Sequence, residues 1–108
     1  MSKIKISILI ANYNNEKYIN RCIDSCIKQN INEKYEIILI DDNSSDNSLQ
    51  KVKKFKNKIR IIKIKESKKG LKFNTFYQLN TYLNGLLRAK GEIVCFLDSD
   101  DYFKKNKP

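Results

Sequence analysis

Two kinds of hydrophobic pattern alternate along the chain, and this alternation restricts the possible folds more than any other feature. Four short runs rich in Ile, Val and Leu have the length and composition of β-strands: 4–11, 35–40, 59–64 and 92–97. Three segments in which apolar residues recur at helical spacing separate them. The resulting βαβαβαβ order predicts an α/β domain with a four-stranded, mainly parallel sheet, right-handed crossovers and helices on both faces. At 108 residues the chain is expected to form one domain over 1–108.

The three helical segments are predicted from their apolar faces and from their start and stop signals. The first has an apolar face formed by Tyr18, Cys22, Ile23, Cys26 and Ile27. The second can be capped by Ser44, Ser45 or Asp46, and its inward residues are predicted to be Leu49, Val52 and Phe55. The third runs from about Phe73 to Ala89, with Gly91 as its stop signal.

The net charge of +10 is concentrated in one stretch of the chain. Residues 51–72 contain eleven basic side chains and a single acidic one, Glu66, so this segment accounts for the whole excess. Such a basic stretch is either a solvated lysine face or a surface that contacts phosphates, nucleic acid or an anionic membrane. A peripheral contact at the inner face of the membrane is one expectation that follows.

Polar and acidic residues gather where the predicted strands end. The first, second and fourth strands are followed by "ANYNN", "DDNSSD" and "DSDD", and the last two of these hold six of the twelve acidic residues. In open α/β sheets, ligands bind outside the carboxyl ends of the strands. The functional site is therefore expected at this edge of the sheet.

The motif "DSDD" suggests a divalent metal site. Residues i and i+2 of an extended chain point to the same side, so Asp98 and Asp100 can converge just past the fourth strand. Hard oxygen ligands suit Mg²⁺ or Mn²⁺, and a sparse carboxylate site leaves positions for substrate phosphates. The alternative is that Asp and Ser simply end strands and begin turns, and this alternative is favoured for Asp41, Asn43 and Ser45 taken alone.

Three motifs in order carry a resemblance to a known family: "ISILIANYNNEKYINRCIDSCIKQN", "YEIILIDDNSSDNS" and "AKGEIVCFLDSDDYF". Together they resemble the nucleotide-sugar-binding half of family 2 inverting glycosyltransferases, which have the Rossmann-like GT-A fold. The resemblance covers nearly the whole chain. It implies a glycosyltransferase that takes a nucleotide-diphospho-sugar, usually UDP-linked, and transfers the sugar to an acceptor hydroxyl with inversion. The acceptor, a glycan or a lipid-linked molecule, is not specified.

The resemblance also implies roles for individual residues. Ala11 and Tyr13 would border the nucleobase, and Asp42 would accept a hydrogen bond from uracil N3. Asp98 would lie near the ribose and the metal, Asp100 would coordinate the metal that bridges the diphosphate, and Lys72 would face the nucleotide.

The sequence departs from the family pattern at several positions. Family members commonly have Pro where Ala11 stands, and an Arg and an Asn that usually face the donor are replaced within Thr81, Tyr82 and Leu83. The chain stops at Pro108, whereas the family's acceptor site and general base follow the metal motif. The catalytic base is therefore expected beyond Pro108, and the chain is expected to be truncated and inactive alone.

Two other functional classes share some of these features. A phospho-receiver signalling domain also has βα repeats and an acidic pair with Mg²⁺, but its acidic pair closes the first strand, which here ends in "ANYNN". A basic nucleic-acid-binding module would bind with steep salt dependence, yet no RNA-binding signature accompanies the lysines, and no nucleic-acid partner is expected. Cys22, Cys26 and Cys95 have no His partner and are expected to be buried thiols in a cytoplasmic protein.

Overall fold

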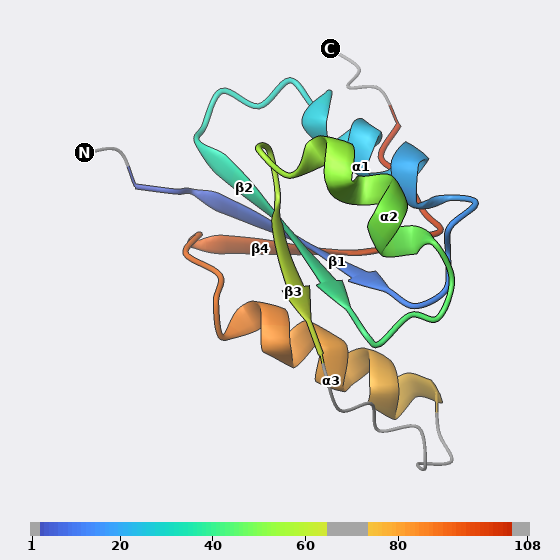
Figure 1. The fold of residues 1–108 in the computed structure, drawn as a ribbon. Coiled ribbons are helices and arrows are strands. Elements are labelled where there is room, and N and C mark those ends of the chain that lie inside the picture. Colours follow the sequence, from blue (N-terminus) through green and yellow to red (C-terminus); the bar gives the residue numbers. More distant parts are fainter. Residues whose placement is uncertain (1–2, 65–73, 105–108) are drawn as a thin grey trace.

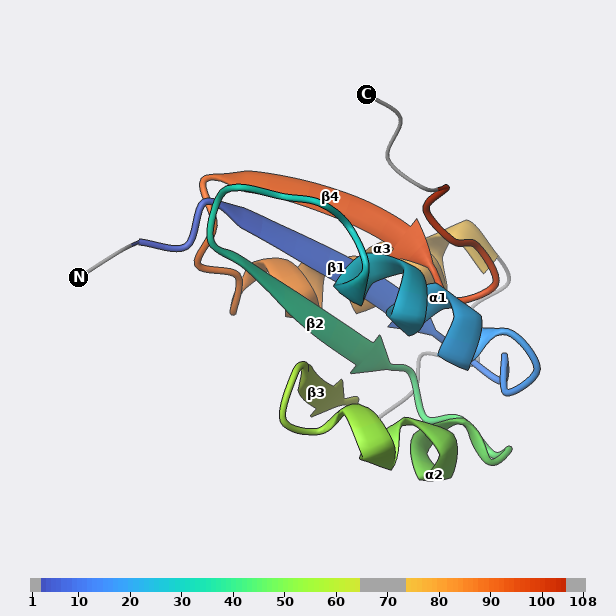
Figure 2. The ribbon, with the colours of Figure 1, turned by 90° about the horizontal axis from the view of Figure 1, so that it is seen from above.

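A parallel four-stranded sheet organises the chain. The computed structural model describes residues 3–64 and 74–104. Its strands are β1 (Ile6–Asn12), β2 (Tyr35–Asp41), β3 (Arg60–Lys63) and β4 (Ile93–Asp98). They lie side by side in the order β3-β2-β1-β4, and every pair is parallel (Figure 2). The predicted α/β class and parallel sheet are confirmed.

Helices cover both faces of this sheet. The helices α1 (Ile19–Ile27) and α2 (Ser48–Val52) lie on one face, together with the 3₁₀ turn η1 (Lys53–Phe55). The helix α3 (Asn74–Leu86) lies on the other face (Figure 1). Among the residues that the structure describes, no helix is both long enough and apolar enough to cross a bilayer.

Each face of the sheet has its own hydrophobic core, because successive strand residues point to opposite sides. The larger core lies under α1 and α2 and contains Ile8, Ile10, Ile37 and Leu39 of the central strands with Ile19, Cys22, Ile23 and Cys26 of α1. The smaller core lies under α3 and contains Leu9, Ile38 and Ile40, with Tyr82 and Val94 packed against them. Burial on both sides, which the apolar runs predict for the second and fourth strands, holds for β2. It is wrong for β4, because this strand lies at the edge of the sheet with Ile93 and Phe96 about half exposed.

The observed helices differ from the predicted ones in ways that have physical causes. Tyr18 precedes α1 and is 44% exposed, so its predicted place in the apolar face was wrong and Ile19 is buried instead. The second helix changes into η1 after Val52, where Lys56 N donates to Lys53 O at 3.2 Å, a bond of the 3₁₀ type. The last turn of α3 tightens in the same way, with Ala89 N donating to Leu86 O at 3.3 Å.

Gly91 does not stop α3 in a left-handed conformation, because no described glycine has a positive φ. Its role is close packing against β1. A Cβ at this position would lie 2.6 Å from the backbone nitrogen of Ser7 and 2.7 Å from the carbonyl carbon of Ile6. The Gly91 N–H also donates to Ser7 Oγ at 2.8 Å, so the chain enters β4 in close contact with the central strand.

Candidate functional site

The carboxyl ends of β1 and β4 form the switch point of the sheet. From β1 the chain moves outward through β2 to β3 and then returns to the other side of β1 as β4. In parallel α/β sheets, the loops at such a switch point diverge and leave a crevice for a ligand. The polar motifs that follow β1 and β4 meet at this edge.

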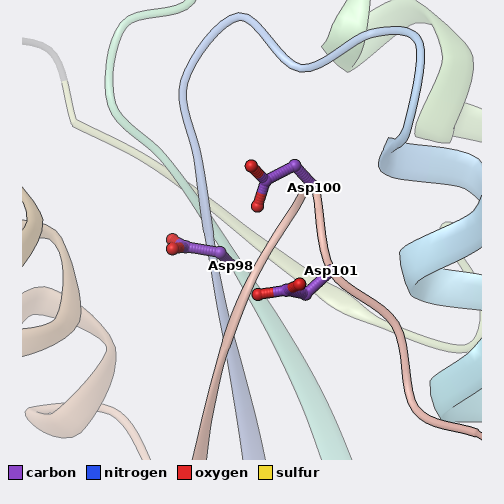
Figure 3. Close-up of side chains that lie close together, drawn as sticks. All are labelled: Asp98, Asp100 and Asp101. Atoms are coloured by element: carbon purple, nitrogen blue, oxygen red, sulfur yellow. The ribbon is translucent and has the colours of Figure 1, made fainter.

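The acidic cluster, which consists of Asp98, Asp100 and Asp101, lies at this point (Figure 3). Asp98 ends β4, and Asp101 N donates to Asp98 O at 2.9 Å, which closes the turn. One carboxylate oxygen of each residue lies within 4.8 Å of the others. The predicted convergence of Asp98 and Asp100 is confirmed, and Asp101, which was not predicted as a ligand, joins them.

The donor set of this cluster fits a hard divalent cation. Asp98 is partly buried, whereas Asp100 and Asp101 are exposed, so a cation could reach the oxygens from solvent. Three like charges this close repel one another unless a positive charge lies among them. Oxygen ligands of this kind match Mg²⁺ and Mn²⁺.

Ser99 fixes the turn from beneath. It is fully buried, and its N–H donates to Ala11 O at 3.0 Å. Its hydroxyl donates to Asn12 Oδ1 at 2.8 Å and accepts from Asn15 Nδ2 at 2.8 Å. The residue between the two predicted ligands therefore anchors them to β1. No pattern in the sequence predicts this role of Ser99, whose only signal is its position between two acidic residues.

A buried hydrogen-bond network continues from Asn12 to β2. Asn12 and Asp41 are adjacent in the parallel register and each is 1% exposed. Asn12 Nδ2 donates to Asp41 Oδ1 at 2.7 Å, and Asp41 also accepts from the Ser44 hydroxyl at 2.7 Å and from Ser44 N at 3.0 Å. Asp41 thus supports the loop after β2 rather than facing a ligand, which agrees with its interpretation as a turn residue.

The residues expected near a nucleobase lie at the same edge. Ala11 is opposite Asp98 in the register between β1 and β4. Tyr13 follows β1 and is 46% exposed, while Asp42 follows β2 and is 7% exposed. Asp42 N donates to Asn12 O at 2.9 Å, so the ends of β1 and β2 stay joined beyond the sheet. Lys72 lies outside the described residues.

The departure from the family pattern on α3 introduces an aromatic residue beside the acidic cluster. Thr81 is 3% exposed, and the Tyr82 ring packs edge-on against Phe96 of β4 with 4.8 Å between centroids. Burial raises the pKa of the Tyr82 hydroxyl, and the negative charge of Asp98 raises it further. The structure thus places a neutral phenol near Asp98, a proximity that the sequence does not predict.

A shallow depression of about 340 Å³ lies nearby but contains none of the predicted site residues. Its lining comes from the loops after β1 and β2 and includes Asn14 and Asp46. Burial alone would raise the pKa of Asp46, but hydrogen bonds from Ser48 and from Glu16 N hold this pKa below its usual value. Asp46 accepts from Ser48 N at 3.0 Å just before α2, but the N-cap residue is Asn47, so none of the predicted caps Ser44, Ser45 and Asp46 occupies that position.

The comparisons with known proteins agree with this geometry. The model of the family described as Glycosyl transferase family 2 matches residues 7–107. The chain belongs to this family. Over 103 residues it is 36% identical to the poly(ribitol-phosphate) beta-N-acetylglucosaminyltransferase TarS of Staphylococcus aureus (strain Mu50 / ATCC 700699), a match that covers 94% of the chain and 17% of that protein.

Solved structures of glycosyltransferases share the fold. The structure of S. aureus TarS 1–349 in complex with UDP-GlcNAc superimposes with a TM-score of 0.73 at 32% identity, covering 92% of this chain and 27% of that one. The mannosyltransferase PcManGT of Pyrobaculum calidifontis, in complex with GDP-Man and Mn²⁺, gives a TM-score of 0.73 at 20% identity and covers 95% and 29%. The GT-A fold is therefore confirmed. The chain spans less than a third of the length of these relatives.

Proposed function

We propose that this family 2 chain is the donor-binding part of an inverting glycosyltransferase and that it binds a UDP-sugar through Mg²⁺ or Mn²⁺. The observation that carries the proposal is the convergence of three carboxylates at the switch point of the sheet. The similarity to a TarS structure that contains UDP-GlcNAc supports a UDP-linked donor. The family match makes a receiver domain or a nucleic-acid-binding module the weaker alternatives.

In this proposal Asp98 and Asp100 hold the metal, and Asp101 is near enough to contribute a third oxygen. A bound divalent ion would neutralise the charge that develops on the departing diphosphate, which removes the need for a general acid. The anchored turn at Ser99 would keep the two carboxylates in place. Ala11, Tyr13 and Asp42 would form the nucleobase side of the site, and Lys72 would face the nucleotide.

We propose that the acceptor-binding half and the general base belong to a segment of the protein that follows residue 108. Exposed apolar side chains on α3 and β4 support this proposal, because large exposed apolar patches usually mark contact surfaces. Leu79, Leu83 and Leu87 of the α3 region are 58%, 56% and 83% exposed, and Phe96 of β4 is 52% exposed. The acceptor, a glycan or a lipid-linked molecule, would bind against that second half.

The test of the nucleobase contact is the substitution Asp42→Asn. The uracil N3–H needs an acceptor, and an amide can present its donor group instead, so UDP affinity should fall by about 1 to 3 kcal/mol. Calorimetry measures the loss, and the Mn²⁺ dependence should persist. Asp24→Asn is the control, since Asp24 lies on α1 and pairs with Lys28. Equal UDP affinity in Asp42→Asn and wild type would reduce Asp42 to a turn residue.

The basic surface is proposed to contact the inner face of the membrane. Of the predicted basic stretch 51–72, residues 65–72 lie outside the described residues, and the rest presents seven exposed cations: Lys51, Lys53, Lys54, Lys56, Lys58, Arg60 and Lys63. Of these, only Arg60 and Lys51 have an acidic partner within the described part of the chain, at 3.5 Å and 4.0 Å. Co-sedimentation with anionic vesicles that is lost at high salt would support this contact. Sedimentation that does not depend on anionic lipid would contradict it.

We propose that the protein is located in the cytoplasm, because its cysteines suit a reducing compartment. All three are free thiols, and Cys22 and Cys26 are buried. Contact with Cys26, together with burial, raises the pKa of the Cys22 thiol, so Cys22 is an unreactive core residue.

A further inference from the structure

Arg21 of α1 lies against the turn that carries the acidic cluster. Its Nη2 donates to the carbonyl oxygen of Asp100 at 3.2 Å. Its guanidinium carbon lies 4.2 Å from the centroid of the Tyr102 ring and 5.5 Å from that of Tyr18. No ion pair joins Arg21 to a carboxylate in the described part of the chain, so the contact is to the backbone and to two rings.

Other side chains of α1 hold the same segment, residues 98–104. Cys22 Sγ contacts Asp98 O at 3.6 Å, and Ser25 Oγ accepts from Phe103 N at 3.0 Å. Just past the helix, Gln29 Nε2 donates to Lys104 O at 3.3 Å. The Phe103 side chain packs against the larger core. The segment is therefore attached to α1 at its beginning and its end, and Arg21 is the contact nearest to the exposed carboxylates.

The contacts of Arg21 restrain a turn in which neighbouring carboxylates repel one another. Without a cation, the charges of Asp100 and Asp101 favour conformations of the turn in which the two carboxylates separate. A metal that binds such a turn must first order it, and that ordering reduces affinity. A planar guanidinium that stacks on Tyr102 while it binds Asp100 O restrains the turn before the metal arrives.

We propose that Arg21 is a positioning residue, which holds the backbone of Asp100 so that Asp100 and Asp101 stay directed toward the metal. The inference rests on the proposed function, since it assumes that the acidic cluster binds a divalent ion. Arg21 itself touches neither metal nor nucleotide in this account. Its effect is on how well the ligands are ordered in advance.

The test compares Arg21→Met and Arg21→Lys with wild type, using Mn²⁺ with saturating UDP as the probe. Loss of one hydrogen bond and the ring contacts should weaken Mn²⁺ binding about tenfold in Arg21→Met. Arg21→Lys should also bind more weakly than wild type, because an ammonium group lacks the planar fork and the stacking surface. Lys28→Met is the control, since it removes a cation just past α1 that pairs only with Asp24 among the described residues.

A second readout separates positioning from a simple effect of charge. Amide exchange measured by NMR without metal should become faster at residues 99–104 in both Arg21 variants and remain unchanged in β1 and β2. Wild-type Mn²⁺ affinity in Arg21→Lys, or unchanged exchange in Arg21→Met, would overturn the positioning role. If the wild-type chain bound no Mn²⁺ in the presence of UDP, the donor-site proposal would be overturned, whereas wild-type Mn²⁺ affinity in both Arg21 variants would overturn only the role of Arg21.

Discussion

Replacing Asp98 and Asp100 together with asparagine should abolish the Mn²⁺ dependence of UDP binding. Each substitution removes a charged oxygen ligand while it keeps the shape of the side chain. If each lost contact costs about 1.5 kcal/mol or more, the affinity for UDP in the presence of Mn²⁺ should fall by about a hundredfold. The residual affinity should equal that of the same variant in EDTA.

The fold should survive this double substitution, because it removes two of three neighbouring negative charges while asparagine keeps the shape of each side chain. Melting temperature is the check, and it should not decrease. Asp24→Asn serves as the matched control at a carboxylate of α1 that pairs with Lys28. If the double variant kept its Mn²⁺-dependent binding of UDP, the metal would have to lie elsewhere.

The 108-residue chain should transfer no sugar, even when it binds the donor. Inverting transfer needs a base within hydrogen-bond reach of the acceptor hydroxyl, on the face opposite the leaving diphosphate. The described carboxylates near the site already have other roles: Asp41 bonds Asn12 and Ser44, and Asp46 accepts from Ser48 N at the start of α2. If the acceptor surface belongs to a following segment, as proposed above, the chain alone also lacks the advantage of positioning, which can reach about 7 to 11 kcal/mol.

An assay of the purified chain with UDP-glucose, UDP-galactose and UDP-N-acetyl sugars against mixed acceptors tests this expectation. The readout is acceptor-dependent release of UDP, and the Asp100→Ala variant is the control for release by a contaminant. Release that requires an acceptor and disappears in Asp100→Ala would show that the chain is a complete enzyme. The assignment of the base to a following segment would then be wrong.

Hydrophobic pattern predicted the fold of this chain well because its strands are short, apolar and clearly separated. The order of strands and helices, the parallel pairing and the convergence of Asp98 and Asp100 all follow from local periodicity. The sequence-based predictions were wrong where contacts between distant parts of the chain determine the local structure. Gly91 suits a helix stop by its local sequence, yet its position is determined by the backbone of β1.

The supporting parts of the site could not be predicted, because their partners are far away in sequence. Ser99 bonds Asn12 across 87 positions, and Arg21 reaches the backbone of Asp100 across 79. Tyr82 approaches Asp98 only because α3 packs on the face toward which the side chains of Phe96 and Asp98 both point. A single sequence shows which residues can bind a metal. The residues that keep those ligands in position can be identified only from the folded structure.

The most direct test of the account is calorimetric titration of UDP into the wild-type chain, once with Mn²⁺ and once with EDTA. Asp98 and Asp100 leave coordination positions that a diphosphate can fill, so UDP should bind at least about tenfold more tightly with Mn²⁺. Mg²⁺ should give the same direction of change. Equal affinity with and without metal, or no binding of UDP in either titration, would contradict a metal-dependent donor site at the carboxyl edge of this sheet.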